Sequence, residues 1–278
     1  MMRKFMVAIT TAAALCGCSD ESNKLSPLAD ASVPFATAPV DASEPDTSTE
    51  PGFRDAGALD AADANACRVI NIGILGNPGS LPSSNFQAWL TKAGTTVARI
   101  QTGTTPLVAN DLTPFDVIIL DWLQHDYSPA EVAIVQAFVE AGGGLIAMTG
   151  YSGGTSDWRA NPLLASLGVS YVGGLVGGPV KIFMPHPITQ GLSSVTFNGG
   201  YLVGTLGASP NKLTPIAAIP KGNVAYAIEA SKGRAFVWGD EWIEFDSEWS
   251  HLPEIKQLWV NVFAWIAPSG CPLTPPPN

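Results

Sequence analysis

The sequence predicts an α/β domain built on a doubly wound, mostly parallel β-sheet, with additional strands in its C-terminal half. The first observation is that short β-branched runs alternate with helical segments between residues 68 and 149. The second is the unbroken apolar run in 116–121 (DVIILD), which is typical of a central parallel strand buried on both faces. Together they give the order strand, helix, strand, strand, helix, strand with short links, which is the pattern of a doubly wound sheet.

Each element of this first half has its own signal. β-branched runs predict strands, and capping residues predict helix starts, with Ser84 before a helix at 85–93 and Ser128-Pro129 with Glu131 before a helix ending at 140. Because crossovers between parallel strands are right-handed, the carboxyl ends of these strands should share one edge of the sheet. The predicted strands span 68–75, 95–101, 116–121 and 144–149.

The second half is less regular. A closing helix at 252–266 carries apolar side chains at helical spacing, which indicates a stripe that faces the core. The proline-rich end, 272–278, cannot continue the fold. Before the closing helix, the sequence predicts a short helix at 158–167 and strands at 169–172, 194–197, 201–203, 213–218, 225–230 and 235–238.

The N-terminus has the pattern of a secretion signal. Arg3 and Lys4 precede an apolar run, residues 5–15, that is too short to span a bilayer. The run ends in Leu-Cys-Gly-Cys-Ser, which resembles the bacterial lipobox. The resemblance implies that residues 1–18 contain the lipoprotein signal and that acyl chains on Cys18 anchor the chain in a membrane. Ser19 favours the outer membrane of a Gram-negative bacterium; an ordinary signal peptide is the alternative.

Residues 19–66 form a linker of different composition. Ala, Asp, Ser, Pro and Thr dominate it, and its ten acidic residues against Lys24 and Arg54 give a net charge of −8. Such a segment cannot bury enough apolar surface to fold, so we expect a disordered acidic tether. The domain that follows residue 66 has fourteen acidic and ten basic residues, and this mild negative balance argues against a nucleic-acid partner.

Two cysteines remain after the N-terminal pair, Cys16 and Cys18, is assigned to the signal region. Cys67 and Cys271 lie at the two ends of the predicted fold. In an oxidising envelope compartment, such a pair predicts a disulfide. The sequence therefore predicts one folded domain, residues 67–271, closed by this bond.

Three segments carry a family resemblance: EVAIVQAFVEAGGGLIAMTG at 131–150, HPITQGL at 186–192 and KGRAFVWGD at 232–240. The first resembles a helix, turn and strand of class I glutamine amidotransferase-like domains, and the other two resemble segments of their ThuA-like (trehalose-utilisation-like) relatives. The resemblance covers residues 69–266 in order. It implies a flavodoxin-like sheet and no particular activity.

Gly150-Tyr151-Ser152-Gly-Gly matches the G-x-S-x-G elbow of serine hydrolases. In the amidotransferase-like family a nucleophilic Cys occupies this elbow; here there is none, so glutamine amidotransfer is not expected. One hypothesis is a serine hydrolase that uses Ser152 and His251, because Asp240 or Asp246 lies between them in the order of α/β-hydrolases. Against it, residues 153–156 separate Ser152 from the next helix, and glycines in a sharp turn explain the pattern equally.

An acidic and aromatic segment follows the last strong strand, at the edge where doubly wound sheets bind ligands. Carboxylates accept hydrogen bonds from hydroxyls, and indoles offer flat apolar faces. The sequence therefore predicts a site for a small polar ligand or carbohydrate. Asp240 and Glu241 as a catalytic pair acting on an ester or glycoside are an alternative, as are turn capping and core packing. The candidate ligand-binding residues are Asp121, Trp122, Tyr151, Asp240, Glu241, Trp242, Asp246 and Trp249.

No cofactor or metal is expected. The loop at 76–79 lacks the spacing of nucleotide-binding loops, no metal-ligand spacing is present, and His186 between two prolines reads as a structural residue. The favoured interpretation is an envelope lipoprotein whose ThuA-like domain binds a small polar ligand, more as a binding protein than as an enzyme. A hydrolase and a structural or partner-docking module are the alternatives.

Overall fold

The computed structural model describes residues 67–78, 83–101, 103–150 and 158–277. The predicted signal, the tether and all of the elbow after Gly150 lie outside these ranges, and with them Cys18, Tyr151 and Ser152. Within the described ranges, no helix is both long enough and apolar enough to cross a bilayer.

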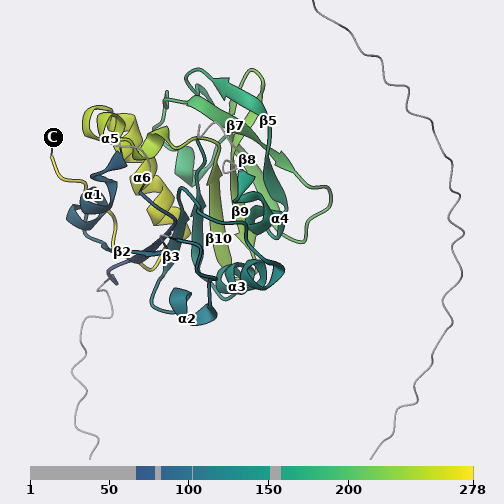
Figure 1. Ribbon diagram of the computed structural model, residues 1–278. Coiled ribbons are helices and arrows are strands. Elements are labelled where there is room, and N and C mark those ends of the chain that lie inside the picture. The colour runs from purple at the N-terminus through teal and green to yellow at the C-terminus, as the bar shows by residue number, and fades with distance from the viewer. Residues whose placement is uncertain (1–66, 79–82, 102, 151–157, 278) are drawn as a thin grey trace, which may run out of the picture. The chain divides into compact units, whose positions relative to one another are not determined.

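Eight strands form one sheet in the order β2-β1-β3-β4-β10-β9-β8-β6 (Figure 1). The first five of these are parallel, and β9, β8 and β6 extend the sheet in antiparallel fashion. This confirms the predicted doubly wound, mostly parallel sheet with added strands from the C-terminal half. The bounds are β1 Asn71–Leu75, β2 Thr96–Gln101, β3 Val117–Leu120, β4 Gly144–Ala147, β6 Ile182–Phe183, β8 Lys212–Ile219, β9 Gly222–Ala230 and β10 Gly233–Trp238.

Helices and a two-stranded sheet cover the two faces. Figure 1 shows α1, α5 and α6 gathered on one side of the sheet, while α4 and β5 lie on the other. One apolar core joins α1 and α6 to the sheet, and a second joins α3, α4, β5 and β7 to its opposite face. These elements are α1 Phe86–Lys92, α2 Ala109–Leu112, α3 Pro129–Glu140, α4 Asn161–Ala165, α5 Asp246–His251, α6 Pro253–Ile266, β5 Val169–Gly177 and β7 Asn198–Thr205.

The central strands fix where the carboxyl edge lies. Every residue of β3 (VIIL) and β4 (GLIA) is buried, as expected for strands covered on both faces. Leu120 pairs with Leu75 on one side and with Ala147 on the other, and Ala147 also pairs with Val237 of β10. The residues that follow β1, β3, β4 and β10 therefore lie side by side at one edge.

The start of α3 follows the predicted capping box. The hydroxyl of Ser128 accepts a hydrogen bond from the backbone N–H of Glu131 (3.4 Å), and the carboxylate of Glu131 accepts one from the N–H of Ser128 (2.9 Å). Pro129 occupies the first turn, where no N–H is required. The prediction for α1 is wrong in detail, because Asn85 is its N-cap and the hydroxyl of Ser84 instead donates to Asp246 (3.3 Å).

Two further local predictions differ from the structure, and some short elements, among them α2, β6 and α5, were not predicted. Of the strand predicted at 194–197, only Val195 forms a bridge, with Val180; the regular strand is β7, which begins at Asn198. The helix predicted at 158–167 is shorter and spans only α4. α5 was not predicted, because the sequence DSEWSH of 246–251 has no long apolar period that would mark a helix.

The predicted disulfide between Cys67 and Cys271 is present and joins residues 204 positions apart. Backbone bonds reinforce it: the N–H of Cys271 donates to the carbonyl of Arg68 (2.8 Å), and Arg68 bridges Gly270. The bond therefore fastens the segment that leads into β1 to the segment that leaves α6.

We expect reduction of this disulfide to lower the free energy of unfolding by about 2–5 kcal/mol, because the unfolded chain regains the freedom of a long loop. Urea denaturation of the full-length protein, with and without dithiothreitol, measures the change. The double variant Cys67→Ser/Cys271→Ser should reproduce the reduced curve and no longer respond to dithiothreitol. Equal stability of the oxidised and reduced protein would contradict the prediction.

Candidate functional site

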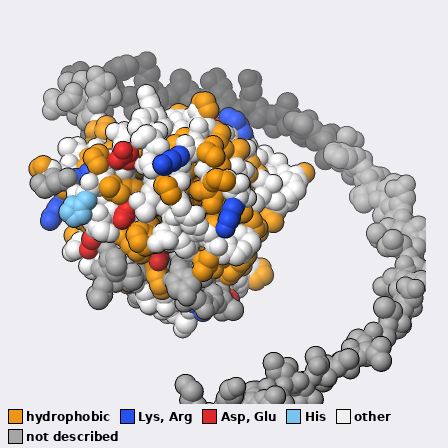
Figure 2. All heavy atoms as spheres, turned by 90° about the horizontal axis from the view of Figure 1, so that it is seen from above, with side chains coloured by type: hydrophobic (Ala, Val, Ile, Leu, Met, Phe, Trp, Pro, Cys, Tyr) orange, Lys and Arg blue, Asp and Glu red, His pale blue; other side chains and the backbone are white. Residues whose placement is uncertain are grey.

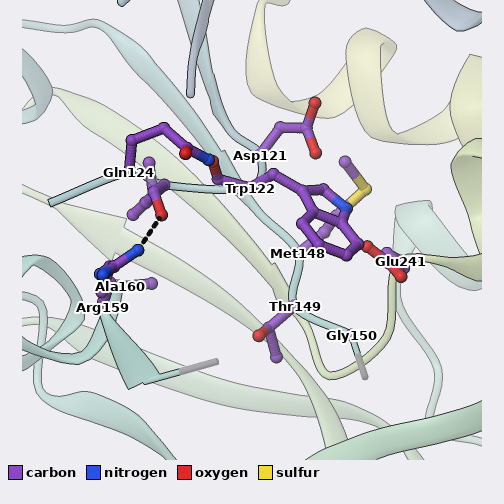
Figure 3. Close-up of a pocket in the computed structure, with 10 residues that line it drawn as sticks. Asp121, Trp122, Gln124, Met148, Thr149, Gly150, Arg159, Ala160 and Glu241 are labelled. Atoms are coloured by element: carbon purple, nitrogen blue, oxygen red, sulfur yellow. Dashed lines mark hydrogen bonds between the residues drawn. The ribbon is translucent and has the colours of Figure 1, made fainter. Parts of the chain in front are cut away.

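A cavity of about 310 Å³ opens at the carboxyl edge of the sheet (Figure 3). Residues that follow β3, β4 and β10 line it, together with the turn before α4. Its volume is at the lower end of the range of about 300–1,000 Å³ that is typical of small-molecule sites. The lining residues are Asp121, Trp122, Leu123, Gln124, Met148, Thr149, Gly150, Arg159, Ala160 and Glu241.

Asp121 is held by an arginine from the neighbouring edge strand. The Nη1 atom of Arg99, on β2, lies 2.8 Å from the Asp121 carboxylate and donates a second hydrogen bond to the carbonyl of Gly76 (3.1 Å). Asp121 is only 3% exposed. Burial raises the pKa of Asp121 to about 6, although Arg99 works in the opposite direction.

A second carboxyl group lies directly against Asp121. Glu244, at the end of the 3-10 helix η4 (Trp242–Glu244), is 1% exposed and donates a hydrogen bond to the Asp121 carboxylate. Burial, with the negative charges of Asp121 and Glu241, raises the pKa of Glu244 well above its usual range. The raised pKa favours the protonated form of Glu244, which can donate to Asp121, and its Oε1 atom has no hydrogen-bond partner among the described residues.

The side chain of Glu241 packs against Gly150, just after the end of β4. A Cβ atom placed on Gly150 would lie 2.3 Å from the Cδ atom of Glu241, so any residue larger than glycine would displace this carboxylate. Glu241 is 6% exposed and lines the cavity. The glycine that was predicted to shape a turn therefore also makes room for a carboxylate from another strand.

Trp122 has an unusual backbone conformation for its type, with φ +27°. Its carbonyl accepts hydrogen bonds from the N–H of Asn77 (3.2 Å) and from the side-chain amide of Gln124. These bonds turn the chain sharply after β3, and Figure 3 shows the indole extending across the cavity toward Glu241. The indole Nε1 atom is buried and has no hydrogen-bond partner among the described residues.

Arg159 lies on the opposite side of the cavity from Glu241 (Figure 3). Its Nη1 atom donates to the carbonyl of Leu123 (3.0 Å), and its Nε atom lies 3.5 Å from the carboxylate of Asp126. The Asp126 side chain is 95% exposed, so water screens this ion pair strongly. Within the described ranges, the ion-pair partner of Arg159 is therefore this exposed carboxylate.

The structure brings Asp121, Trp122 and Glu241 together, but Asp240 has a different environment. Asp240 is completely buried, and its carboxylate accepts hydrogen bonds from the backbone N–H groups of Asn198 and Trp242. It thus joins the start of β7 to the turn after β10 and does not line the cavity. Burial raises the pKa of Asp240 to about 7.

The other residues of the acidic and aromatic segment also lie outside the cavity. Trp242 packs against Phe245, with 5.2 Å between the ring centroids. Asp246 accepts hydrogen bonds from the backbone and side chain of Asn85 (3.2 and 2.8 Å), at the start of α1. The indole of Trp249 stacks on Trp89 and donates to the carbonyl of Glu244 (3.0 Å). The contacts of Asp246 and Trp249 with α1 join separate elements of the fold.

The histidines occupy three separate places. His251 is exposed at the end of α5, and His125 contacts the Glu131 carboxylate at the start of α3 (2.8 Å). The ring of His186 accepts the backbone N–H of Ile188 (3.2 Å), as expected for a structural histidine. None of the three lines the cavity. Ser152 lies outside the described residues, so its pairing with His251 stays a prediction.

Sequence reasoning missed several residues of this cavity. Glu244 and Arg99 are absent from the predicted site, as are Gln124, Thr149 and Arg159. Arg99 had a detectable signal, because a charged residue inside the apolar strand TVARIQ is unusual for a buried position. Arg159 had no such signal in the sequence, because only the tertiary fold brings the turn before α4 beside β3. No group of three or more His, Cys, Asp or Glu side chains within the described ranges is arranged to hold a metal ion.

Solved structures share this architecture at low sequence identity. Cytoplasmic protein STM1381 from Salmonella typhimurium LT2 matches with TM-score 0.54 and 16% identity, over 71% of this chain and 99% of its own. The N-terminal domain of mmIFT52 matches with TM-score 0.55 and 14% identity, over 69% and 96%. A ThuA-like protein from Bacteroides uniformis matches with TM-score 0.47 and 16% identity, over 73% and 94%.

No protein family model matches the sequence, and no curated protein is similar to it. The likeness to the first two structures, at TM-scores above 0.5, shows the fold alone. The chain therefore has a mixed α/β domain of flavodoxin-like type, with a mostly parallel sheet extended by antiparallel strands.

We expect the free energy of unfolding to fall as pH rises from about 4.5 to 7. In this range the unfolded carboxyl groups have ionised, whereas in the folded state Asp121 loses its proton only around pH 6 and Asp240 only around pH 7. The raised pKa of Glu244 acts in the same direction. Each such group lowers the stability by up to about 1.4 kcal/mol per pH unit. Urea denaturation of the full-length protein at several pH values tests this.

One oppositely shifted group and one variant make this test specific to the buried carboxyl groups. The pKa of Glu131 shifts in the opposite direction, because hydrogen bonds outweigh its burial and lower its pKa to about 2. Its contribution to the free energy of unfolding is therefore lost only as pH falls below about 4.5. Asp240→Asn keeps an acceptor for Asn198 but cannot ionise, and it should flatten the curve between pH 5 and 7. A stability that rises steadily across that interval would contradict the assignment.

Proposed function

We propose that this chain is an envelope lipoprotein whose α/β domain binds a small polar ligand at the carboxyl edge of its sheet. The observation that carries the proposal is the cavity itself, where Asp121, Glu241 and Arg159 surround the indole of Trp122. Charged groups fix the position of a ligand, and an aromatic face contributes contact area.

Binding is favoured over hydrolysis by the roles of the carboxyl groups. Asp240, one half of the proposed catalytic pair, already accepts two backbone hydrogen bonds and lies outside the cavity. Asp121 is fixed by Arg99 and Glu244. A serine hydrolase would need a base near Ser152, and no histidine lines the described part of the cavity.

The lipoprotein part of the proposal rests on the sequence. The apolar run that ends in Leu-Cys-Gly-Cys18, followed by an acidic tether of net charge −8, suits a domain displayed at a distance from a membrane. Assignment to the ThuA-like branch likewise rests on the segments HPITQGL and KGRAFVWGD. The disulfide is consistent with an oxidising compartment.

We expect small polar molecules to bind this cavity. The full-length protein in detergent is titrated calorimetrically with monosaccharides, disaccharides, polyols, hydroxy acids and amino acids. Trp122→Leu should weaken binding of any positive probe at least tenfold, because the flat face of the ligand site is lost. The matched control is Trp242→Leu, which removes an indole from the same edge outside the cavity and should leave the affinity unchanged.

Two outcomes would contradict the proposed site. One is that no probe of any class binds. The other is that Trp122→Leu and Trp242→Leu weaken binding equally, which would place the ligand elsewhere on this edge.

We expect Cys18 to carry the membrane anchor. The full-length chain, expressed in a Gram-negative host, should incorporate an alkyne-labelled fatty acid and remain in the membrane fraction until detergent is added. Cys18→Ser should abolish both properties, whereas the neighbouring Cys16→Ser should retain them. Label on Cys18→Ser at the level of the unmodified chain would refute the anchor.

A further inference from the structure

A second cavity, of about 330 Å³, lies between α1, α5 and α6 and shares no lining residue with the ligand cavity. Its walls include the indoles of Trp89 and Trp249 and the C-terminal residues Pro276 and Pro277. We infer that this cavity belongs to a groove that binds proline-rich protein segments in the polyproline II conformation, and that the chain's own C-terminal segment is the resident occupant that a partner replaces. The inference is independent of the proposed function, because it concerns a different surface.

The C-terminal segment is held against the domain, although residues 272–277 form no helix or strand. Leu273 is 6% exposed and belongs to the core that joins α1 and α6 to the sheet. The N–H of Thr274 donates to the carbonyl of Ala93, just after α1 (2.8 Å). Lys256 Nζ donates to the carbonyl of Pro276 (3.5 Å). Figure 1 shows the end of the chain passing beside α1 toward α5.

The composition of this segment determines its backbone conformation. A proline ring fixes φ at about −65°, and a residue that precedes a proline avoids the helical region. Residues 274–276 each precede a proline, so the sequence TPPP favours polyproline II. A backbone in this conformation makes no internal hydrogen bonds, so its carbonyl groups accept bonds from other groups. The bond from Lys256 to Pro276 is a contact of this kind.

The two indoles provide the aromatic surface on which such segments dock. Trp89 and Trp249 stack, with 5.3 Å between the ring centroids and 26° between the planes. Trp89 is 2% exposed, whereas Trp249 is half-buried, so the accessible ring surface is that of Trp249. Aromatic-lined grooves are the usual binding surface for polyproline II segments. The Nε1 atom of Trp89 has no hydrogen-bond partner among the described residues, and the carbonyl groups of a bound segment are acceptors.

The resident segment does not fill the groove, because the cavity of about 330 Å³ remains beside Pro276 and Pro277. Lys92 lines this space and is exposed, so it provides a second ammonium donor for backbone carbonyl groups. A proline-rich segment is already extended before it binds, so the entropy lost on ordering it is small. The groove therefore suits a segment of the same chemistry as the one that occupies it.

Apolar exposure alone would not identify a docking surface on this domain. Figure 2 shows hydrophobic side chains spread over the face seen from above, with charged side chains between them. Scattered apolar residues of this kind are normal on soluble domains. The groove between α1, α5 and α6 differs, because a proline-rich segment already lies in it and thereby indicates which chemistry fits.

The first test removes the resident prolines. A chain that ends at Thr274 keeps Leu273 in the core and the backbone bond to Ala93. This chain and the full-length protein, both in detergent, are titrated calorimetrically with the acetylated and amidated peptide LTPPPN and with LTAAAN, in which alanine replaces the prolines. The truncated chain should bind LTPPPN at least tenfold more tightly than the full-length protein does, and at least tenfold more tightly than it binds LTAAAN.

The second test locates the peptide. In the truncated chain, Trp249→Leu should weaken binding of LTPPPN at least tenfold, because the flat ring on which prolines pack is lost. The matched control is Trp158→Leu. It removes an indole that is 37% exposed and lies outside the groove, and it should leave the affinity unchanged.

Three results would overturn the inference. They are no binding of LTPPPN to the truncated chain, equal affinity of this chain for LTAAAN, and equal affinity of the truncated and full-length chains for LTPPPN. Exchange of C-terminal segments between two copies would also overturn it; sedimentation in density-matched detergent would then show a dimer that the truncation abolishes. If Trp249→Leu fails to fold, the two peptides and the two chain lengths still decide.

Discussion

The ion pair between Arg99 and Asp121 is the interaction on which this edge of the molecule depends. One guanidinium nitrogen, from β2, binds both the carbonyl of Gly76 after β1 and the carboxylate after β3. Three neighbouring strands are therefore joined at the point where the chain leaves the sheet. A buried pair of this kind contributes little net stability, because the cost of desolvation offsets the attraction. Its value here is positional, since it fixes the turn from which Trp122 enters the cavity.

Glu244 extends this arrangement from a pair to a network. Burial raises the pKa of its carboxyl group, which favours the protonated form that can donate to Asp121, where a second carboxylate would repel it. Among the described residues, two buried atoms of this network have no hydrogen-bond partner, Oε1 of Glu244 and Nε of Arg99. A binding site is a place where such incomplete networks are expected, since a ligand completes them.

The sequence was informative where a structural role depends on near neighbours in the chain. Ser128 and Glu131 form their capping box within one turn, and the apolar runs of β3 and β4 mark central strands regardless of context. The disulfide between Cys67 and Cys271 was predicted because the other two cysteines belong to the signal region and the expected compartment is oxidising. The sequence also predicted that the parallel strands end at one shared edge. This follows because crossovers between parallel strands are right-handed in nearly all such folds.

The acidic and aromatic segment could not be resolved from the sequence, because its members face different directions. η4 and α5 turn the chain between Glu241 and Trp249, so Glu241 reaches the cavity, Asp240 reaches β7, and Asp246 and Trp249 reach α1. Composition shows that carboxylates and indoles are present, but not which of them are used to hold the fold. Of these side chains, Glu241 lies against Gly150, just after β4, and lines the cavity.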